Sequence, residues 1–275
     1  MATAGAPART VAPKIVAKGA QKRFPTRRGW VTAVESVDLE VAEGEFVCVV
    51  GPSGCGKSTF LRILAGLDHA TAGEARIVPG SDPKQPLNAV VFQEYAIFPW
   101  KTVLANVAFG PQMRGVTRAE REAIARAWIA KVGLERFEDY YPAQLSGGMK
   151  QRVSIARALA HDPQVLLMDE PLGALDAQTR AVLQEELLRL WEETRKTVVY
   201  VTHSIDEAVL LGDRVVVMTA HPGRVKTEFR IDLPRPRDLT TTSTPAYAAL
   251  TGAVWAALRD EVRAAMAQDA EEVRS

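Results

Sequence analysis

The sequence predicts an α/β fold, in which strands of a sheet alternate with helices. Short apolar runs typical of buried strands recur along the chain. They lie at 46–50, 88–92, 164–168, 197–202 and 214–219. The first run leads into a glycine-rich loop at 51–59, and a helical segment follows that loop at about Phe60. A loop of this kind between a strand and a helix is typical of α/β proteins that hold a phosphate group.

The glycine-rich loop fits the pattern G-x-x-x-x-G-K-[ST] of a phosphate-binding loop. Its members are Gly51, Pro52, Ser53, Gly54, Cys55, Gly56, Lys57, Ser58 and Thr59. Glycine allows successive backbone N–H groups to face one anion at the positive end of a helix dipole. Lys57 can reach the β- and γ-phosphates, and the Ser58 hydroxyl can ligate Mg²⁺. A dinucleotide fingerprint does not fit, because its third glycine falls on Thr59.

Composition narrows the classes of function. The 275 residues are 47% hydrophobic, and 34 basic residues nearly balance 33 acidic ones, which does not favour nucleic-acid binding driven by net charge. The two cysteines, Cys48 and Cys55, form no metal-binding or disulfide pattern, as expected for a reducing cytosol. No apolar run approaches the ~18–20 residues needed to cross a bilayer.

We expect three parts in the chain. Residues 1–13 are rich in Ala, Thr and Pro, lack the apolar core of a signal peptide, and are expected to form a disordered tail. Residues 14–233 form the main domain, with a helical subdomain at about 94–160. Residues 234–275 form a linker and a final helix at about 254–266, expected to pack on the domain edge rather than to bind a partner.

The remaining elements follow from local pattern. Strand-like alternation at 14–18 and 36–41 flanks a turn-rich segment at 24–30, and a short strand at 75–78 precedes a polar loop. Thr117 and Glu120 form a capping box that opens a helix through about Lys131, and Ser146 is a suitable N-cap for a helix to about Ala160. Further elements are expected as helices at 177–195 and 206–211 and a last strand at 225–233.

Polar residues follow the apolar strands where each strand ends. Gln93 follows Phe92, Asp169 and Glu170 follow Met168, and His203 follows Thr202. If these strands are parallel, their carboxyl ends meet over one phosphate group. Asp169 can hold Mg²⁺ through its water shell, and Glu170 can act as general base toward the attacking water. The alternatives are an acidic N-cap pair for the next helix and a structural histidine.

The segment at 145–152, Leu-Ser-Gly-Gly-Met-Lys-Gln-Arg, closely resembles the signature motif of ATP-binding cassette (ABC) ATPases. The resemblance spans about residues 14–233. It includes the P-loop, Gln93 as Q-loop, the signature, the Walker B acids, a D-loop at 173–176 and His203 as switch residue, in the family's order. It implies the P-loop NTPase fold of ABC ATPases: a RecA-like mixed sheet core, an antiparallel β subdomain and an inserted α-helical subdomain.

The resemblance also implies roles for residues beyond the P-loop. Gln93 and His203 join Glu170 as catalytic residues, and Ser58, Gln93 and Asp169 hold Mg²⁺. Nucleotide contacts are implied for Ser146, Gly147, Gly148, Gln151 and Asp176. In the family the signature reaches the γ-phosphate on a second subunit, so a head-to-tail homodimer enclosing two ATP is implied. Gly173 stands where many relatives have Ser, which is expected to weaken one hydrogen bond across that interface.

An aromatic residue after the first strand stacks on adenine in the family. Phe24 fits that location best, and Trp30 is the rival. Either ring could instead have a core or surface role.

The segments at 92–110, 171–180 and 201–225 look like those of importer ATPases for nitrate, aliphatic sulfonates and taurine. This implies an ATP-hydrolysing importer subunit, peripheral on the cytoplasmic face of the membrane. Its partners are a transmembrane permease and, indirectly, a solute-binding protein, with no nucleic acid. The permease would contact residues 94–100, including Tyr95, Phe98 and Trp100, unless these rings pack within the helical subdomain.

Two rivals within the family fit less well. Non-transport ABC proteins carry a long coiled coil between the motifs or two cassettes in one chain. Exporter ATPases are often fused to their membrane spans. Neither feature is found in this sequence.

Overall fold

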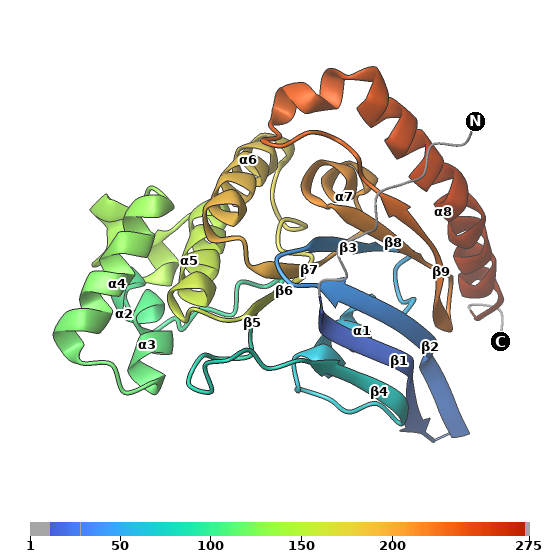
Figure 1. The fold of residues 1–275 in the computed structure, drawn as a ribbon, viewed down its shortest axis with the longest axis horizontal. Coiled ribbons are helices and arrows are strands. Elements are labelled where there is room, and N and C mark those ends of the chain that lie inside the picture. Colours follow the sequence, from blue (N-terminus) through green and yellow to red (C-terminus); the bar gives the residue numbers. More distant parts are fainter. Residues whose placement is uncertain (1–11, 28, 273–275) are drawn as a thin grey trace.

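We describe the protein from a computed structural model that covers residues 12–27 and 29–272. The expected disordered tail lies largely outside the described residues, since only Ala12 and Pro13 of it fall within them. The described strands form one nine-stranded sheet in the order β4-β1-β2-β9-β8-β3-β7-β6-β5 (Figure 1). They are β1 (Pro13–Thr26), β2 (Gly29–Ala42), β3 (Phe46–Val50), β4 (Ala72–Ile77), β5 (Asn88–Val91), β6 (Val165–Asp169), β7 (Thr197–Thr202), β8 (Arg214–Met218) and β9 (Gly223–Arg230).

Strand β3 lies in the parallel half of the sheet. It pairs in parallel with β7 on one side and β8 on the other, and β6 and β5 continue the parallel order. Alternate residues of β3 enter two cores. Phe46, Cys48 and Val50 pack toward the helices α5 (Gly147–Ala160), α6 (Ala177–Thr194) and α7 (Ile205–Leu211). Val47 and Val49 pack toward α1 (Lys57–Leu64) and the β1–β2 strands. Burial on both faces explains the uninterrupted apolar run.

The other half of the sheet is antiparallel. Strand β1 pairs antiparallel with β2 and β4, and β9 joins the halves by pairing parallel to β2 and antiparallel to β8. The predicted mixed sheet is therefore confirmed. The turn expected over 24–30 is shorter than predicted, because β1 runs to Thr26 and β2 begins at Gly29, with Phe24 paired to Val31. The sequence pattern predicted these two strands too short, because register shifts interrupt the alternation of apolar and polar residues along them.

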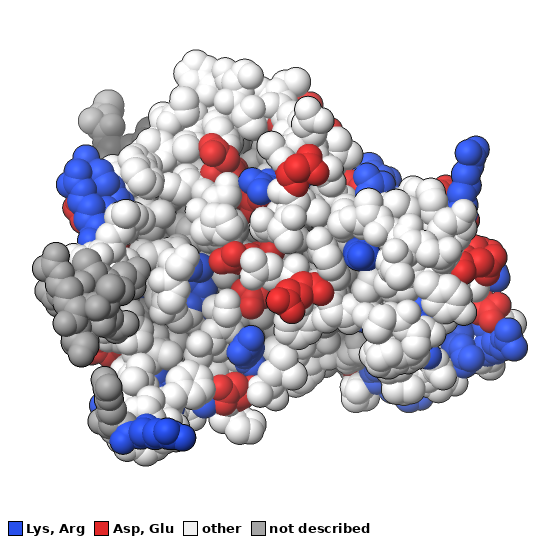
Figure 2. Space-filling view, turned by 180° about the vertical axis from the view of Figure 1, so that it is seen from behind, with Lys and Arg blue, Asp and Glu red and all other residues white. Residues whose placement is uncertain are grey.

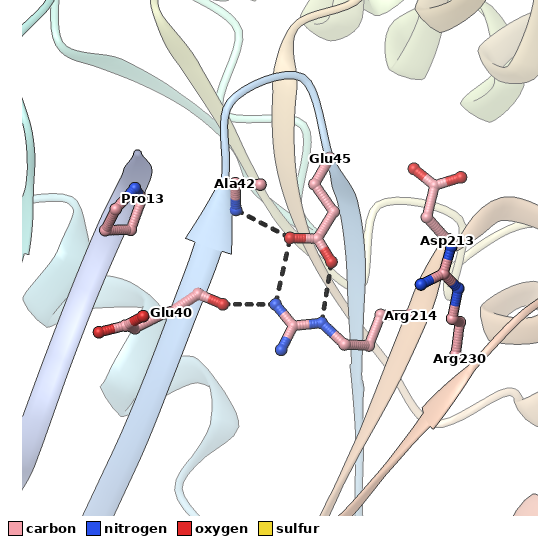
Figure 3. A pocket seen from close by; sticks show the side chains of 7 residues that line it. All are labelled: Pro13, Glu40, Ala42, Glu45, Asp213, Arg214 and Arg230. Atoms are coloured by element: carbon pink, nitrogen blue, oxygen red, sulfur yellow. Dashed lines mark hydrogen bonds and ion pairs between the residues drawn. The ribbon is translucent and has the colours of Figure 1, made fainter. Parts of the chain in front are cut away.

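The amino-terminal ends of the central strands are closed by an ion-pair cluster (Figure 3). Arg214 Nε donates to Glu45 Oε1 at 2.8 Å, and a second nitrogen donates to Glu45 Oε2 at 3.1 Å and to the Glu40 carbonyl. Glu45 Oε2 also accepts the Ala42 N–H at 2.8 Å. These groups border a cavity of about 480 Å³, at the edge of the sheet opposite the glycine-rich loop.

The helices are α1 (Lys57–Leu64), α2 (Val103–Val107), α3 (Phe109–Met113), α4 (Arg118–Lys131), α5 (Gly147–Ala160), α6 (Ala177–Thr194), α7 (Ile205–Leu211) and α8 (Pro245–Glu272). Helices α2–α5 gather at one side of the molecule as the expected helical insertion (Figure 1). Thr117 and Ser146 cap α4 and α5 as predicted. In the described residues, every helix is too short or too polar to span a membrane.

Helix α8 is longer than the predicted 254–266. It begins at Pro245, and Thr244 caps it by accepting the Tyr247 N–H. Tyr247 and Leu250 extend the Val254–Leu258 face toward the start of the helix, but the Pro- and Thr-rich segment before Pro245 and the Ala-rich sequence around them obscured that start. The helix packs on α7 and β8 through Val254 and Leu258. The last strand, expected at 225–233, instead spans 223–230.

Acidic and basic side chains are interspersed on the face drawn in Figure 2, and neither sign forms an extended patch there. This agrees with the near balance of charge in the sequence.

Candidate functional site

The glycine-rich loop connects β3 to α1. Gly56 is the N-cap of α1 and has a φ of 99°. A Cβ on Gly56 would lie 2.5 Å from the Ala33 carbonyl oxygen of β2, so only glycine fits both the conformation and the space. Because Gly56 has no side chain to cap the helix, the first N–H groups of α1 stay available to an anion.

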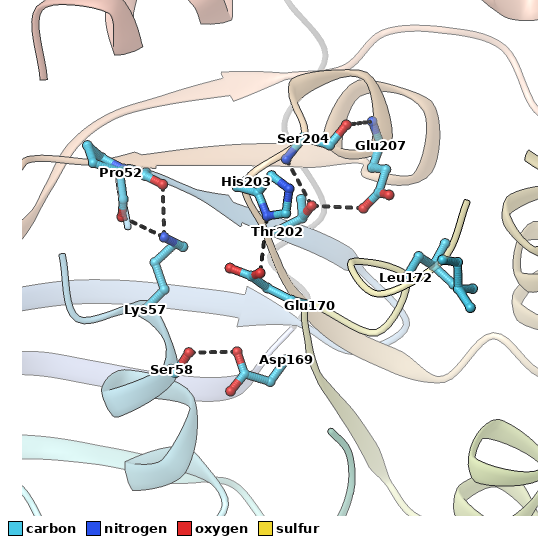
Figure 4. A network of polar contacts seen from close by, with 12 residues as sticks. Pro52, Lys57, Ser58, Asp169, Glu170, Leu172, Thr202, His203, Ser204 and Glu207 are labelled. Atoms are coloured by element: carbon cyan, nitrogen blue, oxygen red, sulfur yellow. Dashed lines mark hydrogen bonds and ion pairs between the residues drawn. The ribbon is translucent and has the colours of Figure 1, made fainter. Parts of the chain in front are cut away.

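Lys57 folds back over the loop (Figure 4). Its Nζ donates to the Gly51 carbonyl at 2.8 Å and to the Pro52 carbonyl at 2.7 Å. It also lies 3.8 Å from Cys55 Sγ. The Lys57 side chain is buried, and burial raises the pKa of the Cys55 thiol. The loop thus holds one positive charge next to a thiol that stays protonated.

Ser58 and Asp169 meet at the end of β6. Ser58 Oγ donates to Asp169 Oδ1 at 2.7 Å (Figure 4). Burial raises the pKa of the Asp169 carboxyl, and the Ser58 hydrogen bond opposes that shift. A hydroxyl and a carboxylate oxygen in contact are hard oxygen donors, which Mg²⁺ prefers. These donors therefore fit a magnesium ion.

Gln93 follows β5 and is exposed. With Asp169 and Arg62 it lines a cleft of about 520 Å³. A Cβ added to Gly173 would lie 3.6 Å from both Gln93 Nε2 and Glu170 Oε2. The amide and the carboxylate therefore flank the same glycine, and the structure brings Gln93 to the Walker B acids.

Glu170 and His203 form a contact between β6 and β7. Glu170 Oε2 lies 3.1 Å from His203 Nδ1 (Figure 4). Glu170 has a φ of 45°, and its N–H donates to the Val201 carbonyl of β7 at 2.9 Å. A left-handed conformation costs a non-glycine residue about 1–2 kcal/mol, and it turns this carboxylate toward the histidine. The His203 side chain is 55% exposed, so solvent reaches the pair.

The signature residues lie elsewhere. Ser146, Gly147 and Gly148 begin α5 in the helical layer, while the P-loop and the acids lie at the sheet. Ser146 is exposed, and its Oγ accepts the Met149 N–H at 3.3 Å. A Cβ on Gly148 would lie 2.6 Å from Thr179 Cγ2. The structure thus does not bring the signature and the P-loop of one chain to one place.

Gln151 differs from expectation. It was expected to contact nucleotide, but it is 0% exposed, and neither side-chain amide atom has a hydrogen-bond partner among the described residues. A residue on the inner face of α5 cannot reach a ligand at the helix start. Asp176 is exposed at the N-cap of α6, where its carboxylate accepts the Gln178 and Thr179 N–H groups. Those backbone bonds lower its pKa.

The two aromatic candidates for adenine stacking differ in placement. Phe24 is 38% exposed and Trp30 is 67% exposed. Phe24 pairs with Val31 and Trp30 with Pro25, so strand alternation places the rings on opposite faces of the hairpin. Lys22 Nζ lies 4.9 Å from the Phe24 ring centroid.

Of the three aromatic residues after Gln93, Tyr95 and Phe98 are partly buried and Trp100 is exposed. Phe98 packs on Phe109 with centroids 4.7 Å apart and on Trp100 at 5.6 Å, and Trp100 is 71% exposed. Phe98, Phe109 and Met113 line an apolar groove of about 360 Å³. Asn106 holds this segment by accepting the Phe98 N–H and donating to the Phe98 carbonyl.

Sequence reasoning missed a polar network behind His203. Glu207 is buried in α7, and its carboxylate accepts hydrogen bonds from Tyr200 and Thr202. The Ser204-x-x-Glu207 pattern of a capping box gave a usable signal for Glu207. Arg180 was also missed as a partner of this network, at 3.8 Å from Glu207.

A phosphate-binding loop beside a hydroxyl–carboxylate pair and a glutamate–histidine pair, on a mixed sheet of this order, defines a P-loop nucleoside-triphosphatase. The family model described as ABC transporter matches residues 34–173. The chain therefore belongs to the ABC transporter family and is an ABC ATPase.

Relatives cover most of the chain. An uncharacterized ABC transporter ATP-binding protein of Methanocaldococcus jannaschii is 55% identical over 83% of this chain and 86% of its own length. An aliphatic sulfonates import ATP-binding protein of Bacillus cereus is 44% identical, over 82% and 89%. A nitrate import ATP-binding protein of Synechocystis sp. is 45% identical, over 77% and 80%.

Solved structures agree with the fold. The dimeric structure of a bacterial ABC transporter cassette superposes with a TM-score of 0.70 at 36% identity, covering 80% of this chain and all of that one. A dimeric post-hydrolysis state of that cassette bound to ADP and Pi gives the same values.

Proposed function

We propose that this chain is the ATP-binding and ATP-hydrolysing subunit of an importer for a small anionic solute, of the nitrate, sulfonate or taurine kind. The observation that carries the hydrolytic part is the Glu170–His203 contact beside the Ser58–Asp169 contact. The importing part is supported by the sulfonate and nitrate import relatives.

The P-loop holds the triphosphate. The first N–H groups of α1 face the phosphate oxygens at the positive end of the helix. When ATP binds, the Lys57 ammonium exchanges its hydrogen bonds to the Gly51 and Pro52 carbonyls for hydrogen bonds to the β- and γ-phosphates. Phe24 stacks on the adenine ring, on the hairpin face that carries Lys22.

Ser58, Asp169 and Gln93 hold Mg²⁺, which when bound neutralises charge on the phosphate oxygens. Glu170 accepts a proton from the attacking water as general base. His203 donates toward the γ-phosphate and keeps Glu170 oriented through their 3.1 Å contact. Together these groups promote hydrolysis by positioning the water and the phosphate and by stabilising the charge on the phosphate oxygens.

A second copy of the chain completes each site. Ser146, Gly147 and Gly148 of one copy face the γ-phosphate held by the P-loop of the other, and Asp176 lies at the same interface. This is supported by the separation of signature and P-loop within one chain and by the dimeric cassette relative. ATP binding closes the homodimer, and hydrolysis reopens it.

The permease docks on the groove beside Tyr95, Phe98 and Trp100. An exposed Trp next to an apolar groove is typical of a protein contact.

Residues 14–233 form the ATPase domain, with the helical subdomain at about 94–160, and the protein works at the cytoplasmic face of the membrane. A solute-binding protein delivers the solute to the permease without touching this chain.

Purification of the full chain from membranes of its native cells tests the transport assignment. A polytopic permease is expected to co-purify, and Trp100→Asp is expected to lose it while Tyr247→Phe, far from the groove, retains it. Co-purification with ribosomes or DNA instead would overturn the assignment.

Calorimetry of the associated solute-binding protein then tests the solute. Nitrate, taurine and an alkanesulfonate are the probes, and binding of at least one is expected. Selective binding of a sugar or a cation would overturn the anionic solute.

A further inference from the structure

A buried carboxylate lies behind the turn that carries His203. Glu207, in the first turn of α7, is 3% exposed. Its Oε2 accepts the Tyr200 hydroxyl at 2.9 Å and the Thr202 hydroxyl at 2.8 Å. Burying a carboxylate this deeply lowers the stability of the fold unless its oxygens are hydrogen-bonded or ion-paired, so Glu207 depends on these partners.

The partners of Glu207 hold both neighbours of His203 (Figure 4). The Thr202 hydroxyl donates to Glu207 and accepts the Ser204 N–H at 3.0 Å. Ser204 Oγ in turn accepts the Glu207 N–H at 3.2 Å. His203 lies between these two anchored residues, so the direction of its ring depends on them.

Arg180 connects this turn to the one that follows Glu170. Its Nε lies 3.8 Å from Glu207 Oε1. The same guanidinium donates to the Leu172 carbonyl at 3.3 Å and to the Leu175 carbonyl at 2.8 Å. Leu172 lies in the turn that the Gly173 N–H closes onto the Glu170 carbonyl at 3.0 Å, and the Leu175 N–H continues it by donating to the Leu172 carbonyl at 3.3 Å. One guanidinium thus contacts the Glu170 turn and the carboxylate behind His203.

We propose that Arg180 and Glu207 are positioning residues for ATP hydrolysis, which together fix the turn of Glu170 relative to the turn of His203. Arg180 holds the first turn through its carbonyls, and Glu207 holds the second through the Thr202 hydroxyl. The planar guanidinium suits this task because its donors point in fixed directions. The inference rests on the proposed hydrolytic roles of Glu170 and His203.

Steady-state ATPase kinetics of the purified full chain test the proposal. Glu207→Gln and Arg180→Gln are each expected to lower kcat about tenfold, with KM for ATP within about twofold, because displaced catalytic groups lose transition-state stabilisation and not ground-state binding. In a His203→Ala background, Glu207→Gln is expected to cause no further loss. An equal loss of kcat in both backgrounds would overturn a role exerted through His203.

Thr202 provides a gentler test should Glu207→Gln fail to fold. Thr202→Val has nearly the same shape but lacks the hydroxyl, and it is expected to lose kcat about as much as Glu207→Gln does. Thr202→Ser keeps the hydroxyl and is expected to retain most of the turnover. Equal kcat in the two variants would contradict the proposal.

Glu45→Gln is the matched control. It removes a half-buried carboxylate from the Arg214 cluster at the opposite ends of the strands (Figure 3). It is expected to lower Tm and leave kcat unchanged, and a matching loss of kcat would show that the Glu207 effect is general destabilisation. If the wild-type chain itself does not hydrolyse ATP, the proposed function fails; if it does and Glu207→Gln matches it, only this inference fails.

Discussion

Two helices begin at glycine-rich turns in this molecule, and they differ in what surrounds them. The start of α1 is enclosed: Lys57 is buried over the loop carbonyls, and the Asp169 carboxylate touches Ser58. The start of α5 is open: Ser146 is exposed, and its hydroxyl oxygen accepts the Met149 N–H.

The two helix starts therefore differ in the groups that they can offer to a bound nucleotide. The α1 end holds the Lys57 side chain and the Ser58–Asp169 pair, which the proposed function uses to bind and cleave ATP. The α5 end offers N–H groups and a dipole of about half a charge, without the base or the metal ligands. An end of this kind can complete a site but cannot constitute one. We therefore expect changes at the two ends to fail in different ways.

Glu170→Gln is expected to have the largest effect. It removes the base while keeping the shape, so ATP hydrolysis falls by about 10²-fold or more. ATP binding persists because the P-loop is untouched. Single-turnover kinetics with radiolabelled ATP measures both. Turnover at the wild-type rate would remove Glu170 from the base role.

Lys57→Ala breaks the enclosed end in another way. It deletes the buried ammonium that lies over the loop, so ATP affinity is expected to fall about 10- to 100-fold, as for loss of a charged hydrogen bond. Calorimetric titration with ATP and Mg²⁺ measures the change. Lys196→Ala, a lysine paired with Asp162, is the control and is expected to bind normally. Unchanged affinity in Lys57→Ala would contradict its assignment.

Ser146→Arg probes the open end. The bulky cation is expected to block ATP-dependent dimers in sedimentation velocity, while ATP still binds the monomer. Ser146→Ala is the control: it loses the cap of α5, at a cost of about 1 kcal/mol, but adds no bulk. It is expected to dimerise. Intact dimerisation and ATPase activity in Ser146→Arg would argue against a site shared between two chains.

Asp169→Asn is expected to have the smallest effect of these changes, a slight increase in the stability of the folded chain. Burial raises the Asp169 pKa, so the folded chain binds more protons there than the unfolded chain does. Stability is therefore lost as pH rises from the unfolded to the folded pKa, and the penalty persists at neutral pH. Without metal, Asp169→Asn is expected to stabilise the chain by less than about 1 kcal/mol, because solvent still screens the partly buried group.

Thermal unfolding in a chelator at pH 7 and at pH 3 checks this prediction. The gain from Asp169→Asn is expected at pH 7 and absent at pH 3, where the carboxylate is protonated. Lower stability of the variant at pH 7 would contradict a net cost of the charge.

Continuous apolar runs made the core predictable. The bounds of β3 and β7 agree with the sequence pattern because both strands are buried on two faces. The β1–β2 hairpin was predicted too short because register shifts interrupt its alternation, and the start of α8 was missed because it follows a Pro- and Thr-rich segment that looks like a linker. Motif order located the residues at the strand ends, but not how they meet. The burial of Gln151 and the Arg180–Glu207 link depend on packing between distant segments, which local patterns do not record.

The glycines at 56 and 223 bear on protein engineering. A Cβ at Gly223 would lie 1.9 Å from the Cys55 carbonyl oxygen, just as one at Gly56 would meet the Ala33 carbonyl. The backbone of β2 and β9 thus packs closely against the loop, and the nine-residue motif does not encode this packing. Grafting the motif onto another scaffold therefore also requires strands that pack against the loop in the same way. A directed-evolution library can vary the rim of the site but has to leave position 223 without a side chain.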